Sequence, residues 1–404
     1  NVLGRAPKIH SCMPLGCLFI TPVSHLSPPT LMTVHRLIAL DMPASNDMIR
    51  HVRSAWDQGD AVLPIDQRLP ERAKQDLVSV LRPSQIIGPD GNVIQRSDGA
   101  PVEDGDALII STSGSTGTPK GVIHTHQTIE ALLAMSAARL STDASTHWLL
   151  CLPVSHVAGF SILARAVKHG NPLTIHPSFD ASRIDDAVNS GATHVSLVPT
   201  ALARIDASLF HKILLGGAAA PAHLPANVAT TYGMTETFGG IVYDGKPLDG
   251  VVIESIEQQI ILKSPSLFRG YRFSDTAVST DGWFHTHDSG SVDDGVVKIY
   301  GRTDDMINTG GENVWPADVE RVIALLSGIT EVVVRGLPDT TWGERVVAWI
   351  SSSDGAIFTR EDVRDHVKKH LPAFCAPAEV RTINEIPKTS LGKVDIAALR
   401  QIGA

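Results

Sequence analysis

The stretch Ser111-Thr-Ser-Gly-Ser-Thr-Gly-Thr-Pro-Lys-Gly121 is a run of hydroxyls and glycines with one lysine near its end. Glycines let the backbone approach an anionic ligand closely, hydroxyl and N–H groups donate hydrogen bonds to it, and Lys120 adds positive charge. Apolar residues flank the run, with Ala-Leu-Ile-Ile at 107–110 and Gly-Val-Ile-His at 121–124. The sequence therefore predicts a strand, a phosphate-binding loop and a second strand.

The spacing of this loop separates it from the P-loop of the common nucleotide triphosphatases. Gly114, Gly117 and Lys120 follow the order G-x-x-G-x-x-K, whereas the P-loop reads G-x-x-x-x-G-K-[ST]. A flexible Ser/Gly linker is the other interpretation, but linkers seldom lie between two apolar stretches. We therefore favour a phosphate-binding loop of a different kind.

Outward from this loop, strand and helix patterns alternate. We expect helices at 46–58, 71–81, 127–140, 159–168 and 184–189, and strands at 61–65, 148–153, 173–176, 193–198 and 212–215. Ile129, Leu132, Leu133 and Leu140 show the helical period that supports the third helix. Such alternation predicts an α/β fold with mainly parallel sheets covered by helices.

The pattern changes towards the C-terminus. Short alternating strands at 251–254, 259–262 and 296–300 predict a small β subdomain, and residues 304–404 predict a small α+β domain. In that domain we expect helices at 316–326 and 359–370 and strands at 331–335, 345–350 and around 380. We expect three parts: an irregular segment at 1–31, a large domain at 32–303 and the small domain at 304–404. One interpretation of the segment 1–31 is that it lies upstream of the natural start.

Composition narrows the class of protein. The 404 residues are 43% hydrophobic and 19% charged, with a formal net charge of -9, which argues against a nucleic-acid partner. No run reaches the eighteen or so apolar residues of a membrane span, so we expect no integral membrane segment. Four cysteines without metal-ligand spacing, Cys12, Cys17, Cys151 and Cys375, are typical of reduced thiols in the cytoplasm. The sequence leaves open whether the chain forms a homo-oligomer.

Further motifs follow the loop towards the C-terminus. They are Gly216-Gly-Ala-Ala-Ala-Pro221, Thr231-Tyr-Gly-Met-Thr-Glu236, Gly282-Trp-Phe-His-Thr-His-Asp-Ser-Gly290, Gly301-Arg-Thr-Asp-Asp305 followed by Gly310-Gly-Glu312, and Pro387-Lys-Thr-Ser-Leu-Gly-Lys393. Alone, the Thr-Glu pair is more often a helix N-cap than a metal site, and a lysine such as Lys393 is usually a solvated surface residue. Their order is more informative than any one of them.

With all these motifs in this order, the sequence resembles the adenylate-forming superfamily of acyl-CoA and aryl-CoA synthetases, adenylation domains and luciferases, over residues 60–400. The resemblance implies two half-reactions. A carboxylate first attacks the α-phosphate of ATP to give acyl-AMP and pyrophosphate, and a thiol such as that of CoA then takes the acyl group. It also implies Mg²⁺, an adenosine site and a cation where carboxylate and phosphate meet.

The resemblance assigns a role to each motif. The loop residues around the β and γ phosphates are Ser111, Thr112, Ser113, Gly114, Ser115, Thr116, Gly117 and Lys120. Thr235 would bind the α-phosphate, Glu236 the Mg²⁺, and Lys393 would bridge the carboxylate and the α-phosphate. The adenosine residues are Tyr232, Gly217, Ala218 and Ala219, with Asp288 and Arg302 at the ribose. Asp304 would be the hinge about which the small domain rotates to bring Gly310 and Gly311 to the thiol.

Within the superfamily, the sequence is most similar to the o-succinylbenzoate-CoA ligases of menaquinone biosynthesis. The residues that carry this similarity lie at 152–159, 193–200 and 213–221. It implies that His156 takes part in catalysis and that His156, Ser196 and Thr200 contact the acid, although a histidine on an apolar turn is as often structural. Two positions depart from the superfamily pattern, Val394-Asp395 after the lysine and Asn308 after the hinge.

Two other functions stay open at this stage. One is a CoA ligase for another aryl or short acyl acid, and the other is an adenylation module that loads a carrier protein. No phosphopantetheine-bearing carrier motif is fused to the chain, so a free thiol such as CoA is the simpler acceptor.

Overall fold

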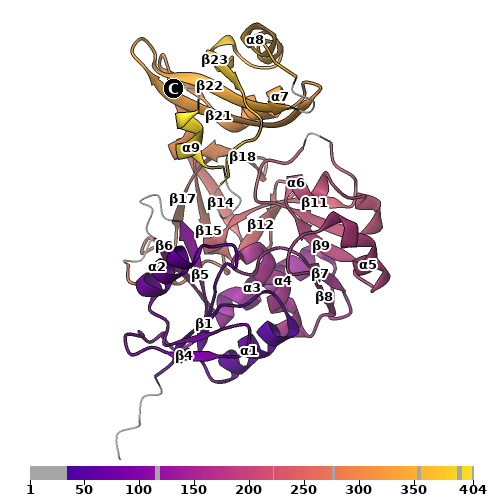
Figure 1. The fold of residues 1–404 in the computed structure, drawn as a ribbon, viewed down its shortest axis with the longest axis vertical. Helices are drawn as coiled ribbons and strands as arrows, with labels where there is room; N and C mark the ends of the chain where they lie inside the picture. Colours follow the sequence, from indigo (N-terminus) through magenta and orange to yellow (C-terminus); the bar gives the residue numbers. More distant parts are fainter. Residues whose placement is uncertain are drawn as a thin grey trace, which may run out of the picture. The chain divides into compact units, whose positions relative to one another are not determined.

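The computed structural model describes residues 34–113, 119–221, 223–274, 278–352, 356–388 and 394–402. Strands and α-helices alternate from β1 to α2 and again from α3 to α6, as the sequence predicts, and four strands, β3 to β6, follow one another between these two runs (Figure 1). The predicted segment 1–31 lies outside the described residues. The α/β fold class is confirmed.

The first sheet has seven strands in the order β16-β6-β5-β2-β1-β3-β4. The strands are β1 (Leu37–Leu40), β2 (Ala61–Pro64), β3 (Gln85–Ile87), β4 (Val93–Gln95), β5 (Asp106–Ser113), β6 (Pro119–Thr125) and β16 (Gly270–Tyr271). Its centre is parallel, since β1 pairs with β2 and β3, and β2 with β5. All four residues of β1 are buried, as expected for a strand covered on both faces.

The second sheet also has seven strands, in the order β13-β12-β11-β10-β9-β7-β8. The strands are β7 (Trp148–Leu150), β8 (Leu173–Ile175), β9 (His194–Leu197), β10 (Lys212–Leu215), β11 (Val228–Met234), β12 (Gly239–Tyr243) and β13 (Lys246–Pro247). The pairings from β8 to β11 are parallel, and β12 and β13 are added antiparallel. The predicted parallel centre is therefore confirmed in both sheets.

The helices of this part begin and end where local signals place them. They are α1 (Asn46–Asp57), α2 (Glu71–Leu81), α3 (His126–Leu140), α4 (Val157–His169), α5 (Ile184–Asn189) and α6 (Pro199–Leu202). The Ser45 side chain accepts a hydrogen bond from the Met48 backbone at the start of α1. A reciprocal capping box between Thr125 and Thr128 begins α3, and Gly170 in the left-handed region ends α4.

The predicted β subdomain is a four-stranded antiparallel sheet. Its strands are β14 (Val252–Ile256), β15 (Gln259–Lys263), β17 (Phe284–Asp293) and β18 (Val296–Arg302). Ile253, Ile260, Leu262, Phe284 and Val297 from these strands belong to the same hydrophobic core as residues of both seven-stranded sheets. Burial of these side chains therefore packs the subdomain against the two seven-stranded sheets.

The C-terminal residues build a sheet of their own, in the order β20-β19-β22-β21 with β23 beside β22. The elements are β19 (Ile307–Thr309), β20 (Glu312–Val314), α7 (Pro316–Ile323), β21 (Ile329–Asp339), β22 (Gly343–Ser352), α8 (Arg360–Lys368), β23 (Glu379–Thr382) and α9 (Ile396–Gln401). Helix α7 ends three residues before the predicted position. Across the described ranges, none of the helices has the length and apolar character needed to cross a bilayer.

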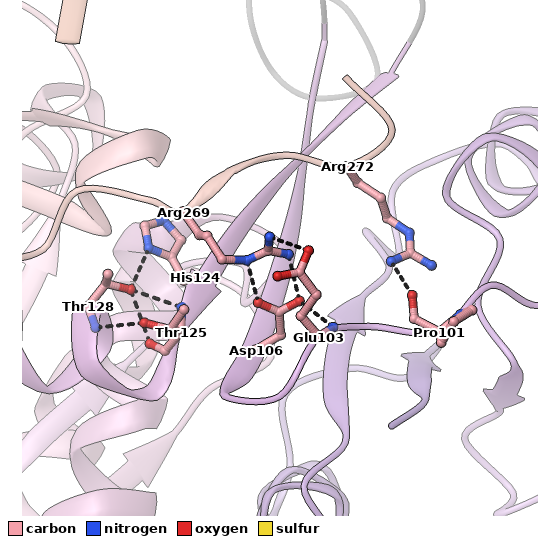
Figure 2. Close-up of polar contacts among 8 residues, drawn as sticks. All are labelled: Pro101, Glu103, Asp106, His124, Thr125, Thr128, Arg269 and Arg272. Atoms are coloured by element: carbon pink, nitrogen blue, oxygen red, sulfur yellow. Dashed lines mark hydrogen bonds and ion pairs between the residues drawn. The ribbon is translucent and has the colours of Figure 1, made fainter. Parts of the chain in front are cut away.

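An ion-pair cluster attaches the segment before β16 to the phosphate-loop hairpin (Figure 2). The Arg269 guanidinium donates to both carboxylate oxygens of buried Asp106, at 2.8 and 2.9 Å, and to Glu103 at 2.6 Å. Such bidentate pairs fix geometry as well as charge. The strand β16 is thereby held at the edge of the first sheet, next to β6.

A close backbone contact positions the start of α4. A Cβ added at Gly159 would lie 2.3 Å from the Pro153 carbonyl oxygen and 2.5 Å from that of Leu152. The contact brings the helix against the loop that follows β7, and no residue larger than glycine fits there.

We expect Gly159→Ala to lower the free energy of unfolding by about 1–3 kcal/mol, because overpacking against backbone cannot be relieved by a rotamer change. The matched control is Gly88→Ala, where the nearest atom to an added Cβ is 3.8 Å away. Urea unfolding followed by circular dichroism measures both. Equal stability of the two variants would contradict the contact.

Candidate active site

The phosphate-loop hairpin has the predicted strand-loop-strand form. β5 and β6 pair antiparallel, with Ser111 opposite Gly121 and Thr112 opposite Lys120. Residues 114–118, which include Gly114, Ser115, Thr116 and Gly117, and the side chain of Ser113 lie outside the described part of the chain. The Lys120 ammonium lies 5.4 Å from the centroid of the Tyr271 ring, so its charge is held at the mouth of the loop by a cation–π contact.

The Thr-Glu motif forms a tight turn between β11 and β12. Thr235, Glu236 and Thr237 make one turn of 3₁₀ helix, and the Thr237 hydroxyl accepts from the Met234 backbone at 3.0 Å. A Cβ on Gly233 would lie 1.9 Å from the Gly239 carbonyl oxygen. The turn is therefore compact, and its two predicted phosphate and metal residues are adjacent in space to the phosphate-loop hairpin through Tyr271.

Glu236 has one carboxylate oxygen in use and one available. Its Oε1 accepts from the Tyr271 hydroxyl at 2.8 Å, and burial together with this carboxylate raises the pKa of Tyr271. Among the described residues, no three His, Cys, Asp or Glu side chains cluster as a metal cage. Proteins usually bind Mg²⁺ through one or two carboxylates, and phosphate oxygens of the substrate and water molecules complete the coordination of the ion. A single carboxylate at Glu236 therefore fits this ion.

The predicted ribose residues lie together in the structure. Asp288, buried on β17, accepts from the Tyr232 hydroxyl at 2.7 Å and from Arg302 at 3.3 Å. β17 and β18 place Asp288 and Arg302 directly opposite each other. Burial raises the pKa of Asp288 against the lowering effect of its two partners, and burial beside Asp288 raises the pKa of Tyr232. The structure therefore brings Asp288, Tyr232 and Arg302 together, and their role at the ribose stays a prediction.

A cavity of about 150 Å³ opens beside this group. Two of the predicted residues, Ser196 and Gly217, line it, together with Gly216, Thr231 and Arg165. Ala218 and Ala219 follow Gly217 in an exposed turn, and Thr200 is exposed on α6. Backbone at the carboxyl ends of β9, β10 and β11 therefore forms one wall of the cavity, which is where ligands bind in open α/β sheets.

The opposite wall is helix α4, and it carries a buried charge. Arg165 is 4% exposed, its guanidinium carbon lies 4.6 Å from the centroid of the Trp148 ring, and one of its nitrogens donates to Ser136 at 2.8 Å. Within the described residues, no carboxylate forms an ion pair with it and its Nε has no hydrogen-bond partner. Burial lowers the pKa of Arg165. A buried guanidinium without an anion is costly, and its position in the cavity suits an anionic ligand.

His156, predicted to touch the acid, lies at the start of α4 in a different network. Its Nε2 is 2.9 Å from an Arg68 nitrogen and 3.5 Å from Asp66, and it is not among the residues that line the cavity. Arg68 pairs with buried Asp66, which also accepts from Ser155 at 3.0 Å. Burial opposes the charge on Asp66, but hydrogen bonds from Arg68 and His156 outweigh it and lower the pKa of that carboxyl. The role of His156 in substrate contact stays a prediction.

The C-terminal motif residues are only partly within the described ranges. Asp304 lies in a short 3₁₀ turn after β18, and Gly310 and Gly311 have positive φ between β19 and β20. The Gly310 amide donates to the Trp342 carbonyl at 2.8 Å. Lys393 falls in the undescribed segment 389–393, so its catalytic role stays a prediction.

Sequence reasoning missed Arg165, Tyr271 and the Asp66–Arg68 pair. A signal for Arg165 was present, because it stands between Ala164 and Ala166 on a helix whose other inward positions are Phe160, Ile162 and Leu163. A charged residue on a buried helical stripe demands a partner. Tyr271 gave no such local signal, since its partner Glu236 is 35 residues away along the chain. Asp66 and Arg68 are two residues apart, but the contact of this pair with the start of α4 through Ser155 spans 89 residues.

Comparison with known protein families agrees with this geometry. The model of the AMP-binding enzyme family matches residues 50–271, and that of the AMP-binding enzyme C-terminal domain matches residues 318–393. The chain belongs to the AMP-binding enzyme family. The first match contains the phosphate loop, the turn at 216–221 and the Thr-Glu motif, and the second extends as far as Lys393; residues 272–317, which include Asp288 and Arg302, lie between the two matches.

Among relatives, this AMP-binding enzyme is 37% identical over 334 residues to a Mycobacterium tuberculosis (strain ATCC 25618 / H37Rv) protein named "Probable 2-succinylbenzoate--CoA ligase", covering 74% of this chain and 85% of the relative. It is 32% identical over 338 residues to a Geobacillus sp. (strain WCH70) 2-succinylbenzoate-CoA ligase, covering 73% and 69%.

Solved structures show the same fold. An o-succinylbenzoate CoA synthetase (MenE) of Bacillus subtilis, in complex with OSB-AMP, aligns at a TM-score of 0.78 and 24% identity, covering 91% of this chain and 88% of that one. An E. coli MenE variant with bound OSB-AMS aligns at a TM-score of 0.75 and 26% identity, covering 91% and 87%. The two-part α/β architecture of this AMP-binding enzyme is that of these proteins.

The Asp288 arrangement leads to a prediction for nucleotide affinity. We expect Asp288→Asn to raise the Kd for ATP about tenfold, because a charged acceptor is replaced by a neutral amide beside Arg302. Isothermal titration calorimetry with ATP and Mg²⁺ measures it. Asp293→Asn is the control, since Asp293 ends the same strand at an exposed position; equal affinities for the two variants would contradict the assignment.

Proposed function

We propose that this AMP-binding enzyme is an ATP-dependent, AMP-forming acid-CoA ligase that converts 2-succinylbenzoate (o-succinylbenzoate) to its CoA thioester. The names of relatives that match over most of both chains support the substrate. The observation in the structure that supports it best is the buried guanidinium of Arg165, which faces the cavity without a carboxylate among the described residues.

The argument from Arg165 depends on the substrate having two carboxylates. One carboxylate must reach the α-phosphate to be activated, and the other stays free and charged throughout the reaction. A free carboxylate entering an apolar cavity is stabilised only if a cation meets it there. Arg165 lies on α4, and the same cavity is also lined by Gly216 and Gly217, where the adenosine would lie.

In the first half-reaction, one carboxylate oxygen attacks the α-phosphorus of ATP and the bond to pyrophosphate breaks. Lys120 and the hydroxyls and amides of residues 111–117 would hold the departing phosphates. Mg²⁺, held by Glu236 when bound, supplies neutralisation of the phosphate charge. Asp288 and Arg302 would hold the ribose, and Tyr232 would border the adenine, so that the α-phosphate is oriented towards the acid.

In the second half-reaction, the CoA sulfur attacks the acyl carbon and AMP leaves. We propose that the domain boundary lies near Asp304 and that Lys393 serves the first half-reaction, whereas Gly310 and Gly311 serve the second after a rotation about that hinge. We also propose that the enzyme acts in the cytoplasm, where ATP and CoA are available. We further propose that the enzyme forms a homo-oligomer, and we assign no interface to it.

A substrate series tests the function. Purified enzyme with ATP, Mg²⁺ and CoA should release AMP and form thioester from 2-succinylbenzoate with a kcat/KM at least about 10²-fold above that for benzoate or acetate, because a buried ion pair discriminates by about 2–5 kcal/mol. A coupled assay for AMP with chromatography of the thioester measures this. A flat profile, or a monoacid as the best substrate, would overturn the assignment.

Arg165 gives a second, sharper prediction. Arg165→Met should raise the KM for 2-succinylbenzoate by about 10²-fold and leave the KM for ATP within about threefold, since only the free carboxylate loses its partner. The wild-type preference over 4-oxo-4-phenylbutanoate, which lacks the ring carboxylate, should disappear in this variant, and Arg165→Lys should keep part of it.

The control for general damage to this region is Arg139→Met. Arg139 lies on the neighbouring helix α3 and donates to the carbonyls of Lys246 and Pro247. The KM of the Arg139→Met variant for 2-succinylbenzoate should equal that of the wild type. If Arg165→Met and Arg139→Met shift the KM values for ATP and acid alike, Arg165 does not bind the substrate.

A further inference from the structure

A fully buried histidine joins the phosphate-loop hairpin to the Thr-Glu turn. His124, on β6, has no exposed surface, and its Nε2 lies 2.7 Å from the backbone carbonyl oxygen of Thr235. Its Nδ1 lies 3.2 Å from the Thr128 hydroxyl, the contact seen beside the α3 capping box in Figure 2. The ring also packs against Phe238, with centroids 5.2 Å apart. Both ring nitrogens are therefore in use.

The two partners determine where the imidazole carries its proton. A carbonyl oxygen can only accept, so Nε2 must be the protonated nitrogen that donates to Thr235. Nδ1 is then an acceptor, which the Thr128 hydroxyl can satisfy. Burial lowers the pKa of His124 to about 4, so a single neutral tautomer is present at neutral pH. His124 therefore has a fixed orientation, with its Nε2–H donating to the carbonyl of Thr235 in the Thr-Glu turn.

The turn is held from its other side by the same strand. β16 pairs antiparallel with β6, which places Tyr271 opposite Val122. The Tyr271 hydroxyl donates to the Glu236 carboxylate at 2.8 Å. Thr235 and Glu236 are thus each connected to β6, the first through the His124 side chain and the second through a strand paired with it. Because β6 begins directly after the phosphate loop, these connections set the distance between loop and turn.

We propose that His124 is a positioning residue for adenylation, which holds the Thr235 carbonyl so that the Thr235 hydroxyl and the Glu236 carboxylate meet a magnesium nucleotide at a fixed distance from the phosphate loop. The proposal rests on the proposed function, because it assigns Thr235 and Glu236 to that nucleotide. His124 does not touch the ligand. It acts through the backbone of Thr235, the residue whose hydroxyl would contact the nucleotide.

Three substitutions separate the two ring nitrogens. His124→Gln places an amide N–H near the position of Nε2 and can keep the bond to Thr235. His124→Asn reaches only as far as Nδ1 and can keep only the bond to Thr128. His124→Leu keeps neither and leaves the Thr235 carbonyl with the Phe238 backbone amide, at 3.1 Å, as its remaining donor. His176→Leu is the matched control, because His176 is also buried but lies after β8, in the second sheet.

The first measurement needs no acid substrate. Calorimetric titration with ATP at fixed Mg²⁺, and with Mg²⁺ at fixed ATP, should show a Kd raised about tenfold in His124→Leu and His124→Asn, because the Thr235 carbonyl loses the donor that ties it to β6. His124→Gln should stay within about threefold of the wild type, a difference of under about 1 kcal/mol. His176→Leu should lose stability but bind the nucleotide normally.

The second measurement is pyrophosphate release with 2-succinylbenzoate. In His124→Leu the KM for ATP and the Mg²⁺ concentration at half-maximal rate should rise, whereas the KM for the acid should not. The proposal is overturned if His124→Asn is active and His124→Gln is not, or if His124→Leu and His176→Leu show the same changes.

Should His124→Leu fail to fold, the comparison of the Gln and Asn variants still decides the question. The two parts of the experiment also keep the proposals apart. Normal magnesium-nucleotide binding by the wild type without turnover of 2-succinylbenzoate would contradict the proposed substrate, and the Kd values of the His124 variants would still test the positioning role.

Discussion

The antiparallel pairing of β5 with β6 is the constraint on which the rest of the site depends. Its register sets Thr112 opposite Lys120 and so determines where the phosphate loop begins and ends. The same hairpin is joined to β2 on one side and to β16 on the other. Through Arg269 and its two carboxylates, it also anchors the segment that carries Tyr271. A shift of one residue in this register would turn each of these side chains to the opposite face.

The site is assembled from three sheets that share one apolar core. The first sheet supplies the phosphate loop, the second supplies the Thr-Glu turn and the glycine wall, and the β subdomain supplies Asp288. Each contributes polar groups at its edge, and none of the groups is close to the others in sequence. Burial of the common core therefore determines the distances between phosphate, sugar and acid ends of the ligands, to within the small tolerance of a close-packed interior.

The sequence predicted elements and motifs well where the information is local. Helix α1 begins after Ser45, whose side chain caps it, and α4 ends at Gly170 because a left-handed residue is needed there. Asp288 and Arg302 were predicted as a pair from motifs 14 residues apart, and a hairpin brings them opposite each other. Arg165 was missed because the sequence does not show that, among the described residues, no carboxylate pairs with its guanidinium. His124 was missed because its partner, Thr235, is 111 residues away. Pairings of that range depend on the packing of whole sheets, which no local pattern encodes.

The glycines of the cavity have a consequence for how the substrate range of such an enzyme can be changed. A side chain at Gly216 would lie 2.5 Å from the Thr231 hydroxyl, and one at Gly233 would meet backbone at 1.9 Å. The wall formed by β9, β10 and β11 therefore leaves no room for a side chain at these two positions. The α4 wall, with Ala158, Ser161 and Arg165, is built from side chains on one regular helix. Substitutions that reshape the cavity for other acids therefore have more room on that helix than at Gly216 and Gly233.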